Sequence, residues 1–343
     1  MSVNELGFAI IGTGMVARYH ATAIERTPGA RLVAVCRSDP ARAEESATQF
    51  GVACLTDYAA LLARADVDAV CICTPSGLHA EQTIAAARAG KHVLVEKPIA
   101  LTLADADAMI AACEQAGVRL GVALQRRTEP EFQRVQAAIA AGELGRIVLG
   151  SISMPYLRLQ SYYDSADWRG TWALDGGGAL MNQGIHLVDL LLWLIGDVTE
   201  VRATSATLAH AIQVEDCVTA TLRFANGALG SISATTAAAP GFPHRIEIYG
   251  DHGGVQIEGE QVVRWAGGNR EPRTQNPEPI AAGAGASPSG IGPIGHLRLL
   301  EDFVAAIRAG CDPLAPGREG RRSLALVLAV YEAARTGRAV RIE

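Results

Sequence analysis

The chain has 343 residues, of which 49% are hydrophobic and 19% are charged, a composition that indicates a globular protein of two domains. Its formal net charge of -6 and its scattered basic residues argue against nucleic acid as a partner. The first apolar run is too short for a signal sequence or a membrane span, so we expect a cytoplasmic protein that has no membrane partner.

The first part of the chain alternates apolar strands with alanine-rich amphipathic helices. Strands are predicted at residues 8–11, 31–36, 69–73, 92–95 and 119–123. Helices are predicted at residues 15–26, 40–50, 81–89 and 102–115. Apolar strands that alternate with helices form a parallel sheet covered on both faces. We therefore predict an α/β protein in which residues 1–124 form a doubly wound Rossmann domain that binds a dinucleotide.

The second part begins with a predicted helix at residues 131–141, after which strands follow one another through turns. These strands are predicted at residues 147–154, 200–208, 216–224, 228–235 and 245–249. Asn226-Gly227 predicts a hairpin, residues 267–295 a long functional or mobile loop, and residues 296–309 and 321–336 two final helices. We predict that residues 125–343 form an α+β domain with a large, mainly antiparallel open sheet that binds substrate. Pairing through this sheet would give a homodimer or homotetramer.

A glycine-rich turn follows the first strand. Gly12, Thr13, Gly14, Met15 and Val16, followed by alanine, form a G-x-G-x-x-A sequence that opens a helix. The first glycine permits a tight turn, the second lets the backbone approach a pyrophosphate, and the helix start offers free N–H groups. This pattern predicts a coenzyme site.

The end of the second strand favours NADP over NAD. An acid here would bind the 2'-hydroxyl of NAD, but the strand ends in Arg37 and Ser38, which suit a 2'-phosphate. The alternative is that Arg37 stacks on the adenine and Asp39 binds the ribose.

Two more strands end in polar residues at the same edge of the sheet, where open α/β folds bind ligands. One ending contains Thr74, Pro75 and His79, and the other contains Glu96 and Lys97. Lys97 is placed to reach a substrate oxygen and the nicotinamide ribose, or else to form a surface ion pair. The seven cysteines include no C-x-x-C pair and no histidine at zinc spacing, so we expect neither a metal nor a disulfide.

In the second domain, residues 176–178 are three glycines before a mostly apolar segment. If this segment is a helix, Asn182, His186 and Asp189 form one polar edge on it, either as a ligand site or as satisfied core residues. Upstream lie aromatic and charged residues that suit a sugar ring, although some could be core or interface: Arg158, Tyr163, Trp168, Arg169 and Trp172. Four arginines could bind a substrate carboxylate or phosphate: Arg126, Arg127, Arg158 and Arg169.

Over essentially its whole length the chain resembles the Gfo/Idh/MocA oxidoreductases, named for glucose-fructose oxidoreductase, inositol dehydrogenase and a rhizopine catabolism protein. The resemblance is carried by these motifs: residues 12–17, 74–79, 89–93, 96–98, 176–178, 184–189 and 331–337. It implies that Lys97 and His186 flank the substrate carbinol, with the nicotinamide between the two domains. His186 would be the general base in oxidation, and Lys97 would polarise the oxygen. Asn182 departs from the aspartate that is frequent in the family, and its amide cannot titrate, so it can only form hydrogen bonds.

We therefore predict an NAD(P)-dependent oxidoreductase that moves a hydride to or from a carbinol or carbonyl carbon of a sugar, an inositol or a sugar derivative. One alternative is a non-catalytic sensor that binds NADP and reports redox state to a partner. The other is a reductase of a non-sugar carbonyl or imine.

Overall fold

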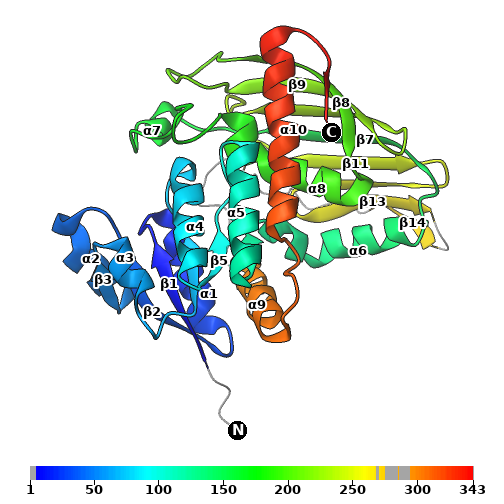
Figure 1. The fold of residues 1–343 in the computed structure, drawn as a ribbon. Coiled ribbons are helices and arrows are strands. Elements are labelled where there is room, and N and C mark those ends of the chain that lie inside the picture. Colours follow the sequence, from blue (N-terminus) through cyan, green and yellow to red (C-terminus); the bar gives the residue numbers. More distant parts are fainter. Residues whose placement is uncertain (1–4, 268–269, 275–284, 286–293, 343) are drawn as a thin grey trace. The chain divides into compact units, whose positions relative to one another are not determined.

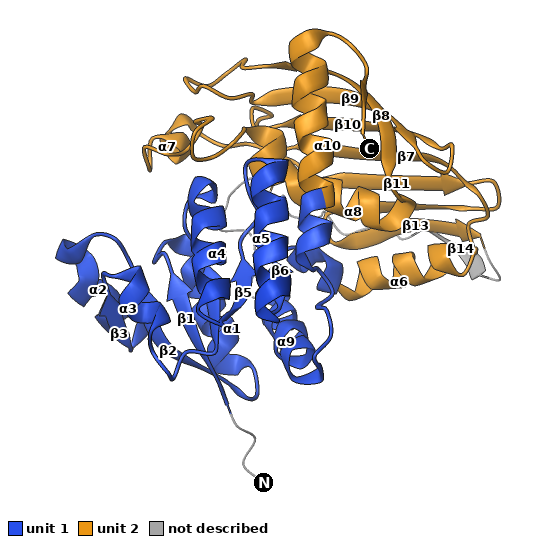
Figure 2. Cartoon of the chain, viewed as in Figure 1, with its two compact units in different colours: residues 1–128, 293–321 blue, residues 129–292, 322–343 orange. Residues whose placement is uncertain are grey.

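A computed structural model describes residues 5–267, 270–274, 285 and 294–342 of the chain. It divides into two compact units, which Figure 2 shows in different colours. Unit 1 comprises residues 1–128 and 293–321, and unit 2 comprises residues 129–292 and 322–343. None of the helices in the described ranges is long and apolar enough to cross a membrane.

Unit 1 contains a six-stranded parallel sheet with the order β3-β2-β1-β4-β5-β6 (Figure 1). Its strands, in chain order, are β1 Leu6–Ile11, β2 Ala30–Cys36, β3 Ala53–Leu55, β4 Ala69–Ile72, β5 His92–Val95 and β6 Leu120–Val122. The strand order reverses between β1 and β4, which is the switch point where such sheets bind ligands. The predicted doubly wound sheet is confirmed, and β3 is a strand that the sequence did not predict.

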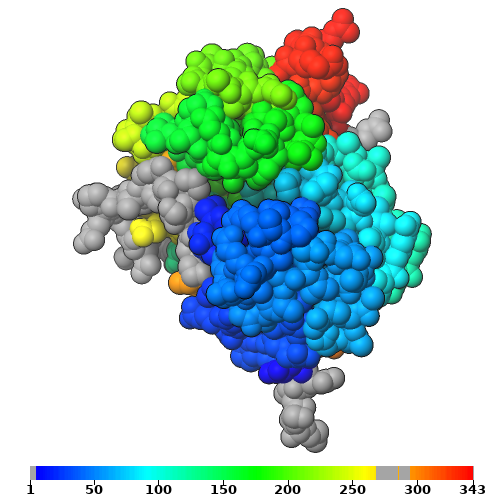
Figure 3. All heavy atoms as spheres, turned by 90° about the vertical axis from the view of Figure 1, so that its left-hand side faces the viewer, coloured from blue at the N-terminus to red at the C-terminus, as the bar shows by residue number. Residues whose placement is uncertain are grey.

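Helices cover this sheet. They are α1 Met15–Arg26, α2 Ala43–Phe50, α3 Tyr58–Leu62, α4 His79–Arg88, α5 Leu103–Ala116 and α9 Ile294–Ala309. One part of the core lies where α1 and α9 pack together over β1, and Phe8 meets Phe303 edge-on with ring centroids 6.5 Å apart. The helices α4 and α5 also pack together. The surface formed by α2, β3 and α3 faces the viewer in Figure 3.

Unit 2 contains a nine-stranded sheet with the order β14-β13-β12-β11-β7-β10-β9-β8-β15. The strands are β7 Ile147–Pro155, β8 Val198–Ala206, β9 Cys217–Phe224, β10 Leu229–Thr235, β11 Arg245–Gly250, β12 Gly254–Glu258, β13 Gln261–Gly267, β14 Arg270–Thr274 and β15 Val340–Arg341. Among the described strands of this nine-stranded sheet, only β7 and β10 pair in parallel. The predicted mainly antiparallel sheet is therefore confirmed. The Asn226-Gly227 hairpin joins β9 to β10, and Gly227 has a φ of 90°.

The loop prediction for residues 267–295 was wrong at its start, because Arg270–Thr274 forms β14. This strand has no apolar alternation and contains a proline, which an edge strand tolerates since its outer N–H groups have no ladder partner. Of the remaining predicted loop, residues 268–269, 275–284 and 286–293 lie outside the described residues.

One face of the large sheet is buried under helices of unit 2. These helices include α6 Pro130–Ala140 and α8 Ile185–Ile195, while α10 Gly317–Thr336 begins within unit 1 and continues in unit 2. Alternate residues of β9 are buried, as expected of a strand with one covered face. Gly150 of β7 admits the Ile195 side chain, which a Cβ would approach to 2.0 Å. Leu149 and Leu229, which pair across β7 and β10, are exposed.

Candidate active site

The turn between β1 and α1 has the geometry that a phosphate group requires. Gly12 has a φ of 87°, and a Cβ there would lie 2.7 Å from the Cys73 carbonyl oxygen, so only glycine fits. Gly14 precedes α1 without a side-chain cap, and a Cβ on it would meet nothing within 4 Å. The start of α1 therefore has no capping side chain, and N–H groups at a helix start can donate hydrogen bonds to a pyrophosphate.

The end of β2 lies beside the same turn. One guanidinium N–H group of Arg37 donates to Ser46 Oγ at 2.8 Å, and the Ser46 hydroxyl lies 3.4 Å from Thr13 Oγ1. Ser38 and Asp39 are exposed, and the Asp39 carboxylate lies 3.9 Å from the Arg37 guanidinium. The structure therefore brings the predicted ribose-binding residues next to the predicted phosphate turn.

At the end of β4, His79 is fully buried and links two predicted motifs. Its ring nitrogens lie 2.8 Å from the Pro98 carbonyl oxygen and 3.0 Å from the Thr74 carbonyl oxygen. Burial lowers the pKa of His79, although these backbone contacts oppose the shift. The His79 ring therefore holds the backbone after β4 close to the backbone after β5, rather than facing solvent.

The Glu96-Lys97 pair directly follows β5. Glu96 is buried, whereas Lys97 is partly exposed between two buried neighbours. The chain contains 28 arginines but only two lysines, Lys91 and Lys97. A lysine at the predicted catalytic position differs chemically from an arginine, because an ammonium is a compact point charge and a guanidinium a planar fork.

In unit 2, close packing explains two of the three consecutive glycines. A Cβ on Gly177 would lie 2.3 Å from the Tyr331 hydroxyl oxygen, and a Cβ on Gly178 would lie 1.7 Å from the Glu215 carbonyl oxygen. The Glu215 carboxylate accepts hydrogen bonds from Gly178 N–H and Leu180 N–H, both at 2.8 Å, and from the Tyr331 hydroxyl at 2.9 Å. Glu215 therefore holds the start of the helical segment that leads to His186.

The predicted polar edge does not form one continuous α-helix. Residues Ala179–Gly184 form a π-helical turn and α8 begins at Ile185, so Asn182 and His186 do not have α-helical i,i+4 spacing. Asn182 donates to the Asp175 carboxylate at 2.6 Å. Asp189 accepts a hydrogen bond from the Ser323 hydroxyl at 3.0 Å, deep in the core. His186 is 8% exposed in the first turn of α8.

The predicted substrate residues gather around Tyr162, which the sequence analysis did not single out. The Arg169 guanidinium donates to the Tyr162 hydroxyl at 2.6 Å and lies over the rings of Tyr162 and Trp168. Gln183, from the π-helical turn, donates to the same hydroxyl at 3.2 Å. The buried Arg158 guanidinium lies over Tyr162 as well. Burial raises the pKa of Tyr162.

Other predicted ligands have partners inside their own unit. The Tyr163 hydroxyl is hydrogen-bonded to Thr236 Oγ1 at 2.8 Å. Trp172 is half exposed, donates to the Gln213 carbonyl oxygen and meets the Tyr331 ring edge-on. Arg127 is buried and pairs with Glu319 at 2.9 Å, so its charge is already balanced within unit 1.

The sequence reasoning missed the acidic groups that hold this site. Glu215 and Asp175 each lie outside the motif that they support, and they reach it only through the fold. Their signal in the sequence is weak: Asp175 directly precedes the glycines, and Glu215 precedes a predicted strand. His20 and His296, which contact Glu96, were also missed because they lie far apart in the chain.

Comparisons with known proteins agree on one family. Residues 6–124 match the family described as "Oxidoreductase family, NAD-binding Rossmann fold", and residues 132–256 match the "GFO/IDH/MocA C-terminal domain". A D-apiose dehydrogenase of Paraburkholderia graminis is 32% identical, with 100% of this chain and 91% of the relative covered. An inositol 2-dehydrogenase of Rhizobium meliloti is 30% identical, with 93% and 94% covered. The solved structure of the WlbA dehydrogenase of Bordetella pertussis, in complex with NADH and UDP-GlcNAcA, is 35% identical, has a TM-score of 0.88, and 99% of each chain is covered.

Proposed function

Because the chain belongs to the Gfo/Idh/MocA family of oxidoreductases with an NAD-binding Rossmann fold, we propose that it transfers a hydride to or from a carbinol or carbonyl carbon of a sugar, an inositol or a sugar derivative. The observation that carries this proposal is the open phosphate turn at Gly12 and Gly14, in the same chain as Lys97 and His186. The relatives named above are dehydrogenases of an apiose and of an inositol, which supports this substrate class.

We assign the catalytic roles to Lys97 and His186. The nicotinamide, when bound, supplies the hydride acceptor or donor. During oxidation His186 takes the hydroxyl proton while the Lys97 ammonium donates a hydrogen bond to the same oxygen; during reduction His186 returns the proton. Asn182 cannot titrate, but its bond to the Asp175 carboxylate fixes the orientation of its amide.

From Arg37 and Ser38 the sequence predicts a preference for NADP over NAD. In the structure the Arg37 guanidinium already donates to Ser46, and Asp39 presents an exposed carboxylate nearby. The similar WlbA structure contains NADH. We propose that NAD is the main coenzyme, because Ser46 already occupies one nitrogen of the Arg37 guanidinium.

The values of kcat/KM for NAD and NADP test this choice. Arg37→Ala should lower kcat/KM for NADP and leave the value for NAD almost unchanged. A clear preference of the wild-type protein for NADP would contradict this proposal and support the NADP preference predicted from the sequence.

The substrate is proposed to be a polar ring that carries a negative charge. No carboxylate of the described residues lies within ion-pair distance of Arg169, whose guanidinium is held by Tyr162 instead. An arginine ordered on aromatic faces suits a substrate carboxylate or phosphate. WlbA was solved with UDP-GlcNAcA, a ligand that bears such groups.

A homodimer or homotetramer through the large sheet remains our proposal for the assembly. Leu149 and Leu229 are 43% and 51% exposed on neighbouring strands. Exposed apolar side chains on an open sheet face favour burial against a second copy. Light scattering of the wild type and of Leu229→Glu would measure this directly, with a smaller assembly expected for the variant.

The decisive experiment is coenzyme-dependent turnover with neutral sugars, inositols, sugar acids and nucleotide-linked sugar acids, followed by absorbance of the reduced nicotinamide. Lys97→Ala and His186→Ala should each lose about 100-fold or more in kcat, the order expected for general acid–base catalysis. A His186→Ala protein with full turnover would refute the acid–base role. Coenzyme binding without turnover on any of these substrates would favour the sensor reading.

A further inference from the structure

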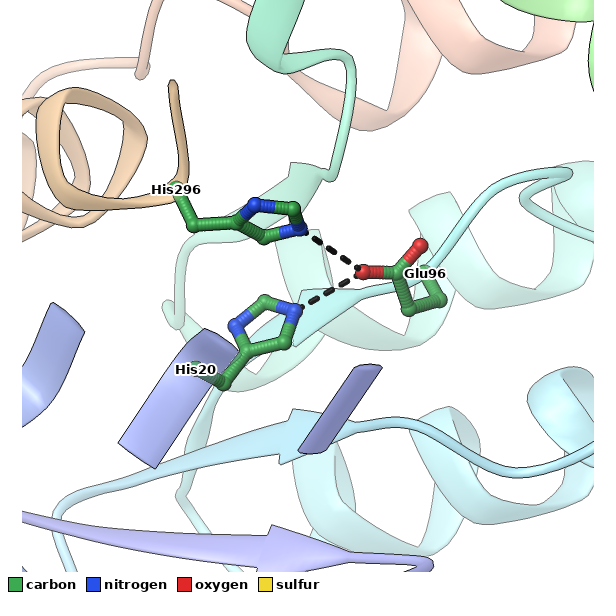
Figure 4. Close-up of side chains that lie close together, drawn as sticks. All are labelled: His20, Glu96 and His296. Carbon is green, nitrogen blue, oxygen red and sulfur yellow. Dashed lines mark hydrogen bonds and ion pairs between the residues drawn. The ribbon is translucent and has the colours of Figure 1, made fainter. Parts of the chain in front are cut away.

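Two histidines and a glutamate form a buried cluster in unit 1 (Figure 4), and the glutamate directly precedes Lys97 in the chain. His20 comes from α1, Glu96 directly follows β5, and His296 comes from α9. His20 Nε2 lies 2.8 Å from Glu96 Oε1, and His296 Nε2 lies 3.7 Å from the same oxygen. Both rings point toward the carboxylate. The proposed reaction assigns no step to either histidine.

The protonation of the cluster follows from its surroundings. Burial alone would raise the pKa of Glu96, but the contacts with His20 and His296 outweigh it and hold this pKa well below its usual range. Burial lowers the pKa of His20. The cluster therefore contains an ionised carboxylate that is hydrogen-bonded to a neutral His20 ring and lies close to the His296 ring.

The other carboxylate oxygen reaches the catalytic residue. Lys97 N–H donates to Glu96 Oε2 at 3.3 Å, so the carboxylate contacts the backbone on the N-terminal side of the Lys97 side chain. On the C-terminal side, the Pro98 carbonyl oxygen lies 2.8 Å from the buried His79 ring. Glu96 and Pro98 are buried, and Lys97 between them is partly exposed.

We propose that His20, His79 and His296 form a frame that positions Lys97, with His20 and His296 acting through Glu96 and His79 acting through Pro98. The inference rests on the proposed function to the extent that Lys97 polarises the substrate oxygen. The three histidines come from α1, α4 and α9, so the backbone around Lys97 is fixed from three helices of unit 1. A displacement of about 1 Å at a reacting group can lower the rate by about 100-fold. Fixing the backbone around Lys97 would therefore have a large effect on turnover.

A metal ion is the competing explanation, because two histidines and a carboxylate can bind zinc or another transition metal. The distance of 2.8 Å between His20 Nε2 and Glu96 Oε1 is that of a direct hydrogen bond. Nδ1 of His20 and Nδ1 of His296 are also buried without a hydrogen-bond partner among the described residues. Metal-bound histidines almost always use this second nitrogen to donate to a neighbour. The geometry therefore favours a hydrogen-bonded frame.

The small number of lysines gives a readout that does not depend on finding the substrate. Amine-acylating reagents modify lysines, and this chain has only Lys91 and Lys97. Lys91 Nζ donates to the carbonyl oxygens of Arg64 and Val67, at the other end of β5. Lys91 thus serves as an internal reference when modification at both lysines is followed by peptide mass spectrometry.

The test compares two double variants. Replacing His20 and His296 by leucine removes both polar rings, whereas replacing them by glutamine keeps an N–H group at each position but removes an imidazole metal ligand. The leucine pair should change the Lys97-to-Lys91 modification ratio and lower kcat by about 100-fold, with coenzyme affinity and KM nearly unchanged. The glutamine pair should recover both quantities. His92→Gln, a histidine change at the far end of β5, is the control and should alter neither.

Two results would overturn the proposal. An unchanged modification ratio and kcat in the leucine pair would show that the frame does not position Lys97. Equal losses in the leucine and glutamine pairs, together with stoichiometric metal in the purified wild type, would assign the cluster to a metal site. If the leucine pair does not fold, His296→Leu alone is used with His296→Gln. If no sugar reacts with the wild type, the proposed function fails, while the modification ratio still tests the frame.

Discussion

Glu215 allows the electrostatics at the start of the His186 segment to be measured. The residue is 4% exposed, and burial raises the pKa of its carboxyl group from 4.5 to about 7, although hydrogen bonds from Gly178, Leu180 and Tyr331 oppose the shift. In the unfolded chain the same carboxyl would ionise near its ordinary value. Between these two pKa values the folded protein binds more protons than the unfolded one.

The sign and size of the effect follow from this difference. The stabilisation of the folded state is complete below the unfolded pKa of 4.5 and is lost as the pH rises through the folded pKa of about 7. The difference of roughly 2.5 between the two pKa values corresponds to about 3 kcal/mol of unfolding free energy. Glu215→Gln cannot ionise, so its stability relative to wild type should increase by about 3 kcal/mol between pH 4.5 and pH 8.

Urea unfolding followed by tryptophan fluorescence is the appropriate assay, because all four tryptophans lie in unit 2 with Glu215. The quantity of interest is how the difference in unfolding free energy between Glu215→Gln and wild type changes with pH. A constant difference caused by the amide itself does not affect this change. Tyr331→Phe removes an O–H donor that lowers the Glu215 pKa, so its loss of stability should continue to higher pH. A difference between wild type and Glu215→Gln that stays flat from pH 4.5 to 8 would refute the reasoning.

Other predictions concern the supports of the same site. Gly178→Ala should destabilise unit 2 by more than about 3 kcal/mol in a urea titration. The new Cβ would lie 1.7 Å from the Glu215 carbonyl oxygen, and relieving this clash requires the backbone to move. Asp175→Ala should lower kcat by about tenfold through loss of the bond that orients Asn182, and unchanged kinetics would mean that this bond has no role. Asp216→Asn should lower the free energy of unfolding by about 2 kcal/mol and with it the melting temperature, because the Asp216 carboxylate accepts hydrogen bonds from three consecutive backbone N–H groups. An unaltered melting temperature would contradict this.

The sequence predicted those features that depend on local patterns. The turn at Gly12 and the helix that follows it occur as expected, because glycine spacing and apolar periodicity act over a few residues. The strands β3, β12, β13, β14 and β15 were not predicted. Among them, Ala53–Leu55 has only three residues, Val340–Arg341 has two, and Arg270–Thr274 lacks apolar alternation. Pairing with longer neighbours forms these strands, and such pairing is a tertiary effect.

At the site, the sequence identified residues better than it identified their contacts. Lys97 and His186 stood out through their motifs, but the sequence suggested that Asn182 and Asp189 share one helix edge. The π-helical turn before α8 separates them, so Asn182 bonds to Asp175 and Asp189 bonds to Ser323. Nothing in local spacing signals such a turn, because it arises where Glu215 holds the backbone from another part of the chain.

Unit 1 is formed by two stretches that lie far apart in the sequence, and this affects how the protein folds during its synthesis. Helix α9 covers Phe8 with Phe303 and carries His296 to Glu96, yet it is synthesised after most of unit 2. A nascent chain that ends before residue 294 therefore exposes an apolar sheet face and leaves the Lys97 segment without one of its supports. Unit 2 is completed later still, because its last stretch, residues 322–343, follows α9, so both units should finish folding only when translation is almost complete.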